Sequence, residues 1–191
     1  MEADWEFELG PDEAGLAAPV IDACWQGFVD LRRSPERVRA LPEAAQLPAL
    51  AEALIRLNGS GSLVWTAKCD YWPHLDSSEF DADELAAPPG CATHATGCYI
   101  DLLPSNRQQW AQPEQAEKAC NRWCGLLRAA PLTCCRVDLV IRRALLTPEQ
   151  RELGITAYLT SCGPSAAEAV QRLEAALAAF TDAIASAAHR R

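Results

Sequence analysis

Hydrophobic positions recur at helical spacing through the first third of the chain. Pro19 suits a first helical turn, and four apolar residues follow it three or four positions apart: Ile21, Cys24, Phe28 and Leu31. Ser34-Pro35 is typical of a second helix start. The apolar stripe from Leu47 to Leu57 predicts a third helix, which Asn58-Gly59 ends. The pattern therefore predicts a helical N-terminal part over residues 13–58.

The period then changes from helical to alternating. Apolar and polar residues alternate in four segments: 63–69, 96–103, 134–146 and 154–162. Helical stripes follow Pro113 and the capping box Ser165-x-x-Glu168. We therefore expect a single α+β domain, residues 1–191, in the order ααα-ββα-ββα, with ββα units at 63–129 and 134–188. Its sheet is expected to be four-stranded and mainly antiparallel, with the helices packed on one face.

The alternation also assigns side chains to the two faces of that sheet. Four residues of the first strand are expected to point toward the helices: Leu63, Trp65, Ala67 and Cys69. Nine polar or aromatic residues are expected to point away from them: Thr66, Lys68, Tyr99, Asp101, Asp138, Arg142, Thr156, Tyr158 and Thr160. Aromatic residues and arginine are enriched in protein-recognition surfaces, so this outer face is a candidate binding surface. The alternative is the ordinary polar face of an antiparallel sheet, with ion pairs across its strands.

A long polar loop separates the first two predicted strands. Its carboxylates are Asp76, Glu79, Asp81, Asp83 and Glu84. The loop lacks the residue order of a calcium-binding loop. It is either a solvated loop or a negative patch that contacts a basic partner.

Soft metal ligands flank this loop. They are Cys69, His74, Cys91, His94 and Cys98. Nitrogen and sulfur ligands that close a loop between two neighbouring strands predict a zinc site, although the spacing matches no standard pattern of paired ligands. The alternatives are that Cys69 and Cys98 are core residues, or that Cys91 is a nucleophile with His94 as its base.

Composition and charge limit the function classes. The formal net charge of the 191-residue chain is −9, which argues against unaided nucleic-acid binding and favours a partner with a basic surface. The start, Met1 to Leu9, is acidic and does not resemble a secretory signal, and no apolar run is long enough to span a membrane. Nine cysteines with no such signal indicate reduced thiols in the cytoplasm, and the abundance of alanine suggests a bacterial source.

The leading hypothesis is a non-enzymatic, cytosolic protein-binding module of a bacterium. Small acidic α+β proteins with this element order resemble immunity proteins, which neutralise toxins, and secretion chaperones. In either case the acidic loop and the outer sheet face would contact the other protein, without nucleic acid or membrane; homodimer formation stays open. The second hypothesis is a small zinc- or thiol-dependent protein centred on the segment Cys69–Cys98. Zinc is the only cofactor that the sequence suggests.

Overall fold

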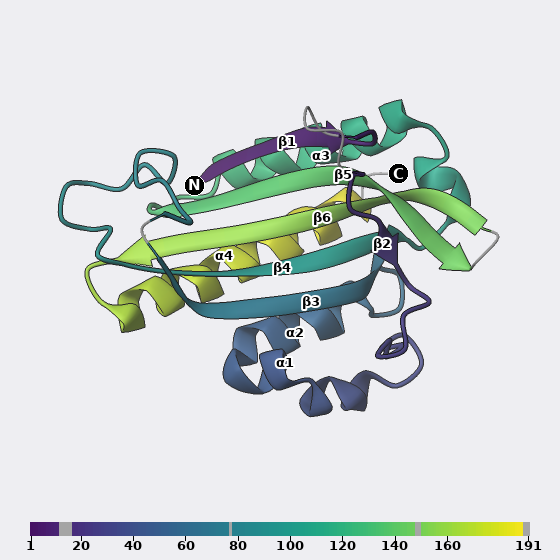
Figure 1. The fold of residues 1–191 in the computed structure, drawn as a ribbon, viewed down its shortest axis with the longest axis horizontal. Helices are drawn as coiled ribbons and strands as arrows, with labels where there is room; N and C mark the ends of the chain where they lie inside the picture. The colour runs from purple at the N-terminus through teal and green to yellow at the C-terminus, as the bar shows by residue number, and fades with distance from the viewer. Residues whose placement is uncertain (12–16, 77, 148–149, 189–191) are drawn as a thin grey trace.

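The computed structural model describes residues 1–11, 17–76, 78–147 and 150–188. It shows an α+β fold in which helices pack against a six-stranded mixed sheet (Figure 1). In chain order the elements are β1 (Glu2–Glu8), β2 (Ile21–Asp22), η1 (Pro35–Ala40), α1 (Pro42–Gln46), α2 (Pro48–Leu57), β3 (Val64–Leu75), β4 (His94–Pro104), η2 (Arg107–Trp110), α3 (Pro113–Arg128), β5 (Cys135–Thr147), β6 (Gln150–Gly163) and α4 (Ala166–Ala188). The predicted α+β class is confirmed.

The strand count and order differ from the prediction of a four-stranded, mainly antiparallel sheet. The main path through the sheet is β1-β5-β6-β4-β3, and β2 pairs beside β5. Both β1 and β2 run parallel to β5, whereas the other neighbours are antiparallel. The order ααα-ββα-ββα is therefore wrong at its start, because the chain begins with a strand. In β1, Ala3 is buried and the acidic residues on either side of it are exposed, which is the period of a strand.

The helix predicted to follow Pro19 is also wrong. Ile21 and Asp22 pair with β5, and turns follow as far as Arg33. Ile21 and Ala23 lie in a small apolar cluster on the sheet face opposite the helices. The apolar spacing therefore reflects contact with the sheet, and this tertiary burial overrides the local helical pattern. Residues 13–16 of the predicted helical part lie outside the described residues.

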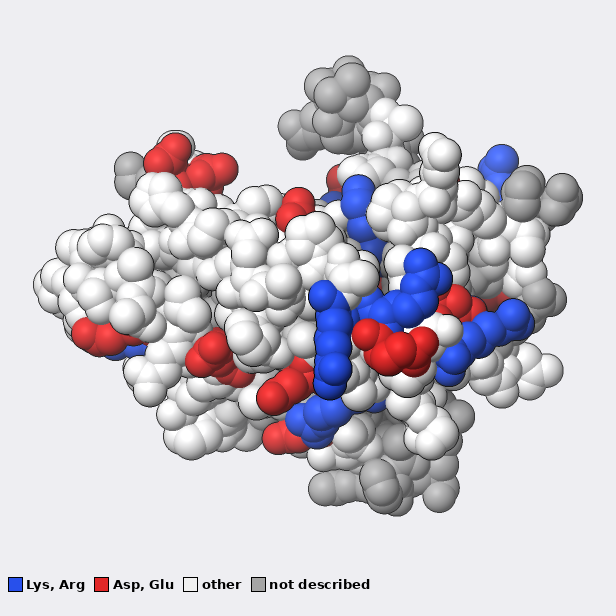
Figure 2. Space-filling model, turned by 90° about the horizontal axis from the view of Figure 1, so that it is seen from below, with Lys and Arg blue, Asp and Glu red and all other residues white. Residues whose placement is uncertain are grey.

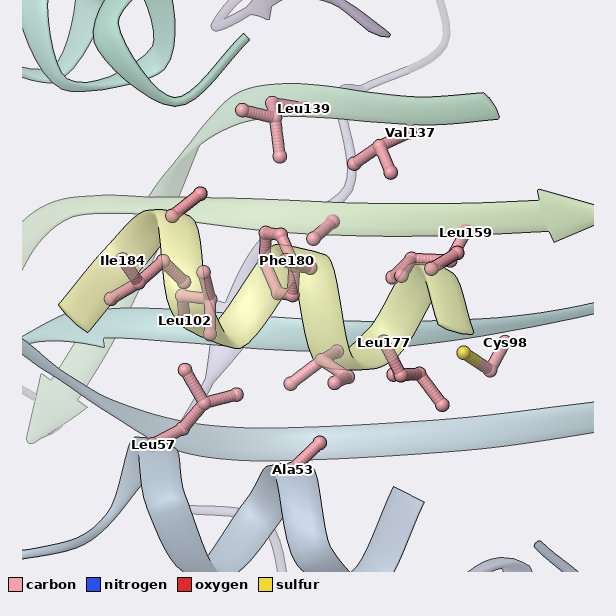
Figure 3. Packing of buried hydrophobic residues seen from close by; sticks show 14 of the residues in the cluster. Ala53, Leu57, Cys98, Leu102, Val137, Leu139, Leu159, Leu177, Phe180 and Ile184 are labelled. Atoms are coloured by element: carbon pink, nitrogen blue, oxygen red, sulfur yellow. The ribbon is translucent and has the colours of Figure 1, made fainter. Parts of the chain in front are cut away.

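The main core lies between the sheet and the helices; in Figure 1, α3 and α4 stand behind the strands, and α1 and α2 lie below β3. Figure 3 shows Leu177, Phe180 and Ile184 of α4 directed at side chains of the sheet, among them Leu159 and Leu102. All five side chains are at most 2% exposed. Within the described ranges, no helix combines the length and apolarity needed to cross a membrane.

An irregularity in β3 changes which residues face the helices. Ala67 and Lys68 together oppose the single residue Asp101 of β4, which is a β-bulge. Before the bulge, Trp65 packs in the apolar cluster on the outer face, while Thr66 points inward and bonds the buried Asn58. The predicted orientations of Trp65, Thr66 and Ala67 are therefore wrong, because the extra residue inverts the alternation along the strand.

Candidate functional site

Two segments cover the ends of the outer sheet face and leave its middle open. At one end, residues 17–30 cover the cluster that contains Trp65 and Leu103. At the other end, the loop of residues 76–93 places Leu85 on Ala95 and Cys162. Between them lies a concavity of about 380 Å³, which we call the sheet trough. The residues that line the trough include Trp25, Lys68, Trp72, Tyr99, Asp101, Arg142, Thr156 and Tyr158.

A row of aromatic rings crosses the strands along the floor of the sheet trough. The ring centroids of Trp72 and Tyr99 are 5.7 Å apart, and those of Tyr99 and Tyr158 are 5.9 Å apart. The Arg142 guanidinium extends the row, 5.5 Å from the centroid of Tyr158. A Cβ at Gly97 would lie 3.1 Å from the Leu159 backbone oxygen and 3.3 Å from the Leu75 side chain, whereas its 3.5 Å distance from the Trp72 ring would be an ordinary contact. The row therefore joins β3, β4, β6 and β5 into one continuous surface.

Polar groups beside the row are tied together by hydrogen bonds. Arg142 donates from Nε to the Glu8 carboxylate at 2.6 Å, and from Nη1 to the hydroxyls of Thr156 (3.1 Å) and Tyr158 (2.9 Å). The Thr156 hydroxyl in turn donates to Oδ1 of Asp101 at 2.6 Å. This network links β1, β5, β6 and β4 and holds the charged groups in fixed positions.

Burial controls the titration of two trough residues. Removal from water raises the pKa of Asp101, while the hydrogen bond from Thr156 and the charge of Arg142 oppose that rise. Burial also raises the pKa of Tyr99, and the negative charges of Asp101 and Asp70 add to the effect. The Tyr99 hydroxyl therefore stays protonated at neutral pH and is available as a hydrogen-bond donor.

The structure brings several of the predicted partner-binding residues together. Tyr99, Asp101, Arg142 and Tyr158 all line the sheet trough. Asp138 lies opposite Tyr158 in the sheet register and is paired with Arg136 at 2.8 Å. Two tryptophans also line the trough: Trp25, which falls in the predicted helical part, and Trp72, which falls in the predicted loop between the first two strands.

The predicted acidic patch belongs to the loop that closes one end of the trough. Its carboxylates are largely exposed: Asp76, Glu79, Asp81, Asp83 and Glu84. Glu84 lies 4.0 Å from Arg136 on the outer sheet face, which places the loop beside that face. In Figure 2, a group of acidic side chains stands at the upper left with no Lys or Arg side chain beside it, whereas acidic and basic side chains lie next to one another in the centre and at the right. The loop end of the molecule is therefore negative next to the trough.

The five predicted metal ligands do not converge. Cys98 points into the main core beneath α4 (Figure 3), and Cys69 packs against the same core. Cys91 lies in the cluster under the 76–93 loop, on the opposite sheet face. His74 is exposed beside Asp76, and His94 contacts Thr93.

Among the described residues, no group of three or more His, Cys, Asp or Glu side chains is placed to hold a metal ion. Zinc binding by this chain stays a prediction.

Most thiols are buried, and burial dominates their titration. Removal from water raises the pKa of Cys69 and Cys135 to about 12 and that of Cys124 and Cys162 to about 11. Thiols with such pKa values are protonated at neutral pH and are poor nucleophiles. These four cysteines therefore suit packing rather than covalent chemistry.

No family model, curated protein or solved structure matches this chain.

Proposed function

We propose that this protein is a non-enzymatic binding module that holds another protein in its sheet trough. The observation that carries the proposal is the aromatic row Trp72–Tyr99–Tyr158, left open between two segments that cover the rest of the outer face. Large aromatic side chains on a rigid sheet provide contact area with little loss of conformational freedom on binding. A partner that covers this row also reaches the exposed Trp25, which is 40% exposed at the edge of the trough.

The negative charge of this protein supports a partner with a basic surface. The chain has a formal net charge of −9, and the acidic loop stands at one end of the sheet trough. Opposite charges on two proteins accelerate their encounter and fix their relative orientation. We expect the acidic loop to contact Lys and Arg side chains of the partner while the trough contacts its apolar and polar groups.

The arrangement of the polar groups favours binding over catalysis. Arg142 is committed to Glu8, Thr156 and Tyr158, and Asp101 accepts from Thr156. Neither described histidine, His74 nor His94, lines the sheet trough. The polar groups of the trough therefore fit a pre-organised surface better than a nucleophile paired with a general base.

Of the two kinds of binding protein, an immunity protein and a secretion chaperone, the trough fits the immunity protein better. Such a protein binds a folded toxin and neutralises it. A chaperone surface would cover an apolar segment of its client. An apolar segment in this trough would remove the exposed Lys68 ammonium from water without offering it a new polar partner. All nine cysteines are free, which supports a reducing bacterial cytoplasm as the place of action.

Site-specific photo-crosslinking tests this proposal. A photoreactive phenylalanine analogue replaces Trp72, and the matched control carries it at Gln171, an exposed position on α4. After irradiation in the native host, we expect a discrete protein adduct from position 72 and none from position 171. Changing Asp81, Asp83 and Glu84 to their amides should weaken that adduct. Equal adducts at both positions, or no adduct from position 72, would refute the proposal.

A further inference from the structure

A second concavity lies at the β3 edge of the sheet, where α1, α2 and residues 25–31 meet that strand (Figure 1). It has a volume of about 290 Å³, and we call it the edge pocket. The residues that define its chemistry are Val29, Leu31, Leu41, Glu43, Leu54 and Asp70. Pockets that enclose a whole small molecule measure about 300–1,000 Å³, so the edge pocket suits a single side chain.

The edge pocket and the sheet trough share a wall. Trp25 and Lys68 line both of them. The Trp25 indole donates from Nε1 to the Ala67 carbonyl at 3.3 Å, which holds the ring against β3. A Cβ at Gly27 would lie 1.9 Å from the Trp25 ring, so the absence of a side chain there lets the ring take this position. A partner that covers the trough therefore lies next to the edge pocket.

Aliphatic side chains form the greater part of the walls. Leu31 and Leu54 are buried, and the half-buried Val29 and Leu41 pack against the same main core. These walls are therefore held in place whether or not the pocket is filled. They offer an apolar surface to the stem of an incoming side chain.

Two carboxylates complete the lining: Glu43 from α1 and Asp70 from β3. Both residues are half-buried, and neither forms an ion pair with another described residue. Oδ1 of Asp70 accepts from the Tyr71 backbone N–H at 2.8 Å, which fixes that carboxylate in place. Burial raises the pKa of the Cys69 thiol to about 12, and the negative charges of Glu43 and Asp70 add to the rise. Both carboxylates therefore act on the same wall of the pocket, to which Cys69 belongs.

Lys68 does not neutralise these carboxylates. Its ammonium lies 5.9 Å from the centroid of the Trp25 ring, and its charge opposes the raised pKa of Asp101 in the trough. Within the described part of the chain, it forms no ion pair with Glu43 or Asp70. Half-buried carboxylates beside apolar walls therefore fit an occupant with an apolar stem and a positive end.

The protein itself holds one arginine by the same combination of contacts. The Arg32 guanidinium lies 3.9 Å from the centroid of the Trp65 ring and donates to the Asp30 carboxylate at 2.8 Å. An aromatic face and a carboxylate together thus position a guanidinium on this fold. The edge pocket offers a tryptophan ring and two carboxylates.

We propose that the edge pocket binds an arginine side chain of the basic partner, an inference that rests on the proposed function. The methylene stem of the arginine packs on the aliphatic walls, and its guanidinium donates to Glu43 and Asp70. Arginine fits this lining better than lysine, because its planar guanidinium donates to two carboxylates at once and stacks on the Trp25 ring. The charge of that side chain complements a protein whose formal net charge is −9.

Titration of the ¹⁵N-labelled protein with Nα-acetyl-arginine amide tests the pocket without the partner. Trp25→Phe and Trp72→Phe each remove one indole N–H signal and so assign both. At constant ionic strength, we expect the probe to shift the Trp25 signal in a saturable way and to leave that of Trp72, which lines the trough alone of the two concavities. Nα-acetyl-citrulline amide, a neutral molecule of nearly the same shape, should leave both signals in place. Nα-acetyl-lysine amide should bind more weakly than the arginine probe.

Variants of the two carboxylates connect the pocket to the partner. Glu43→Gln and Asp70→Asn should each weaken binding of the arginine probe by about threefold to tenfold, because each removes a charge-assisted contact. In the native host, the double variant should also weaken the adduct formed from position 72. The matched control is Glu52→Gln, on an exposed position of α2 outside the pocket lining, and it should change neither result.

Several results would overturn this assignment. It is wrong if the arginine probe leaves the Trp25 signal in place, if the citrulline or lysine probe binds as tightly, or if the Trp72 signal moves equally. It is also wrong if the adduct from position 72 forms in full with both carboxylates replaced. If a carboxylate variant does not fold, the three probes still decide the outcome on the parent chain. The absence of any adduct from position 72 refutes instead the trough as a protein-binding site, and the probe titration then decides the edge pocket by itself.

Discussion

Replacement of Arg142 by methionine should destabilise the protein, because its guanidinium joins strands that are distant in sequence. The side chain is only 12% exposed. It bonds Glu8 of β1, as well as Thr156 and Tyr158 of β6, from its position on β5. Methionine preserves much of the apolar stem but removes every one of these hydrogen bonds.

The expected loss of stability follows from the hydrogen-bond partners that Arg142→Met leaves without a donor. A hydrogen bond to a charged group contributes about 1.5–3 kcal/mol, and a neutral one about 1 kcal/mol. The Glu8 side chain is 36% exposed, so water replaces part of what it loses. The Tyr158 hydroxyl, on a half-buried side chain, recovers part of its hydration as well. We therefore expect Arg142→Met to lower the free energy of unfolding by about 2–3 kcal/mol.

Urea unfolding measures this loss. With an m-value of about 2–3 kcal/mol/M, the midpoint should fall by about 1 M while m stays constant. The matched control is Arg143→Met, since Arg143 is exposed and, within the described residues, donates to the Leu9 carbonyl alone; it should change stability by about 0.5 kcal/mol or less. A double-mutant cycle with Glu8→Gln should show a coupling of about 1 kcal/mol. Equal losses in the two arginine variants, or no coupling to Glu8, would refute this account of the network.

Three further predictions concern titration, backbone packing and thiol exposure. Burial raises the pKa of Asp101 above its ordinary value of 3.8, because the folded protein accommodates the protonated carboxyl better than the carboxylate. The stability that the protonated carboxyl contributes is therefore lost as the pH rises through the raised pKa. Asp101→Asn cannot ionise, so thermal melts should show it gaining stability relative to the parent as the pH rises from about 4 to 7; a constant difference contradicts this. Gly154→Ala places a Cβ 2.9 Å from the Leu102 carbonyl oxygen and should cost about 1–3 kcal/mol in urea unfolding. Its control, Gly125→Ala in α3, meets nothing within 4 Å and should be neutral or stabilising by up to about 1 kcal/mol; equal losses at both positions contradict the packing argument. Iodoacetamide at neutral pH should label the exposed Cys24 well before the fully buried Cys98, as intact mass shows; equal labelling rates contradict the described burial.

The sequence predicted the elements whose pattern is local. The strand predicted at 96–103 corresponds to β4, and the helix predicted from Pro113 corresponds to α3. The Ser165 hydroxyl accepts from the Glu168 backbone N–H at 3.3 Å, as the capping motif predicted. In each case neighbouring residues carry both the pattern and the contacts that stabilise the element, so one sequence suffices to read it.

Some of the candidate site was readable in the same way. Alternation placed Tyr99, Asp101 and Tyr158 on the outer face, and the structure brings them into the sheet trough. The same rule failed in β3, because the bulge at Ala67 and Lys68 inverts the alternation before it. A single extra residue in a strand leaves no clear mark in the hydrophobic pattern.

By itself, the sequence determined the α+β class, most strands and helices, and the acidic balance of the surface. Only the tertiary structure decided that β1 and β2 join the edge of β5, and that residues 17–30 lie on the sheet rather than in a helix. It alone placed Trp25 and Trp72 at one trough. The physical reason is the range of the interactions. The spacing of hydrophobic residues reports the local secondary structure. Strand partners, covering segments and cavities depend instead on contacts between segments that are distant in the chain.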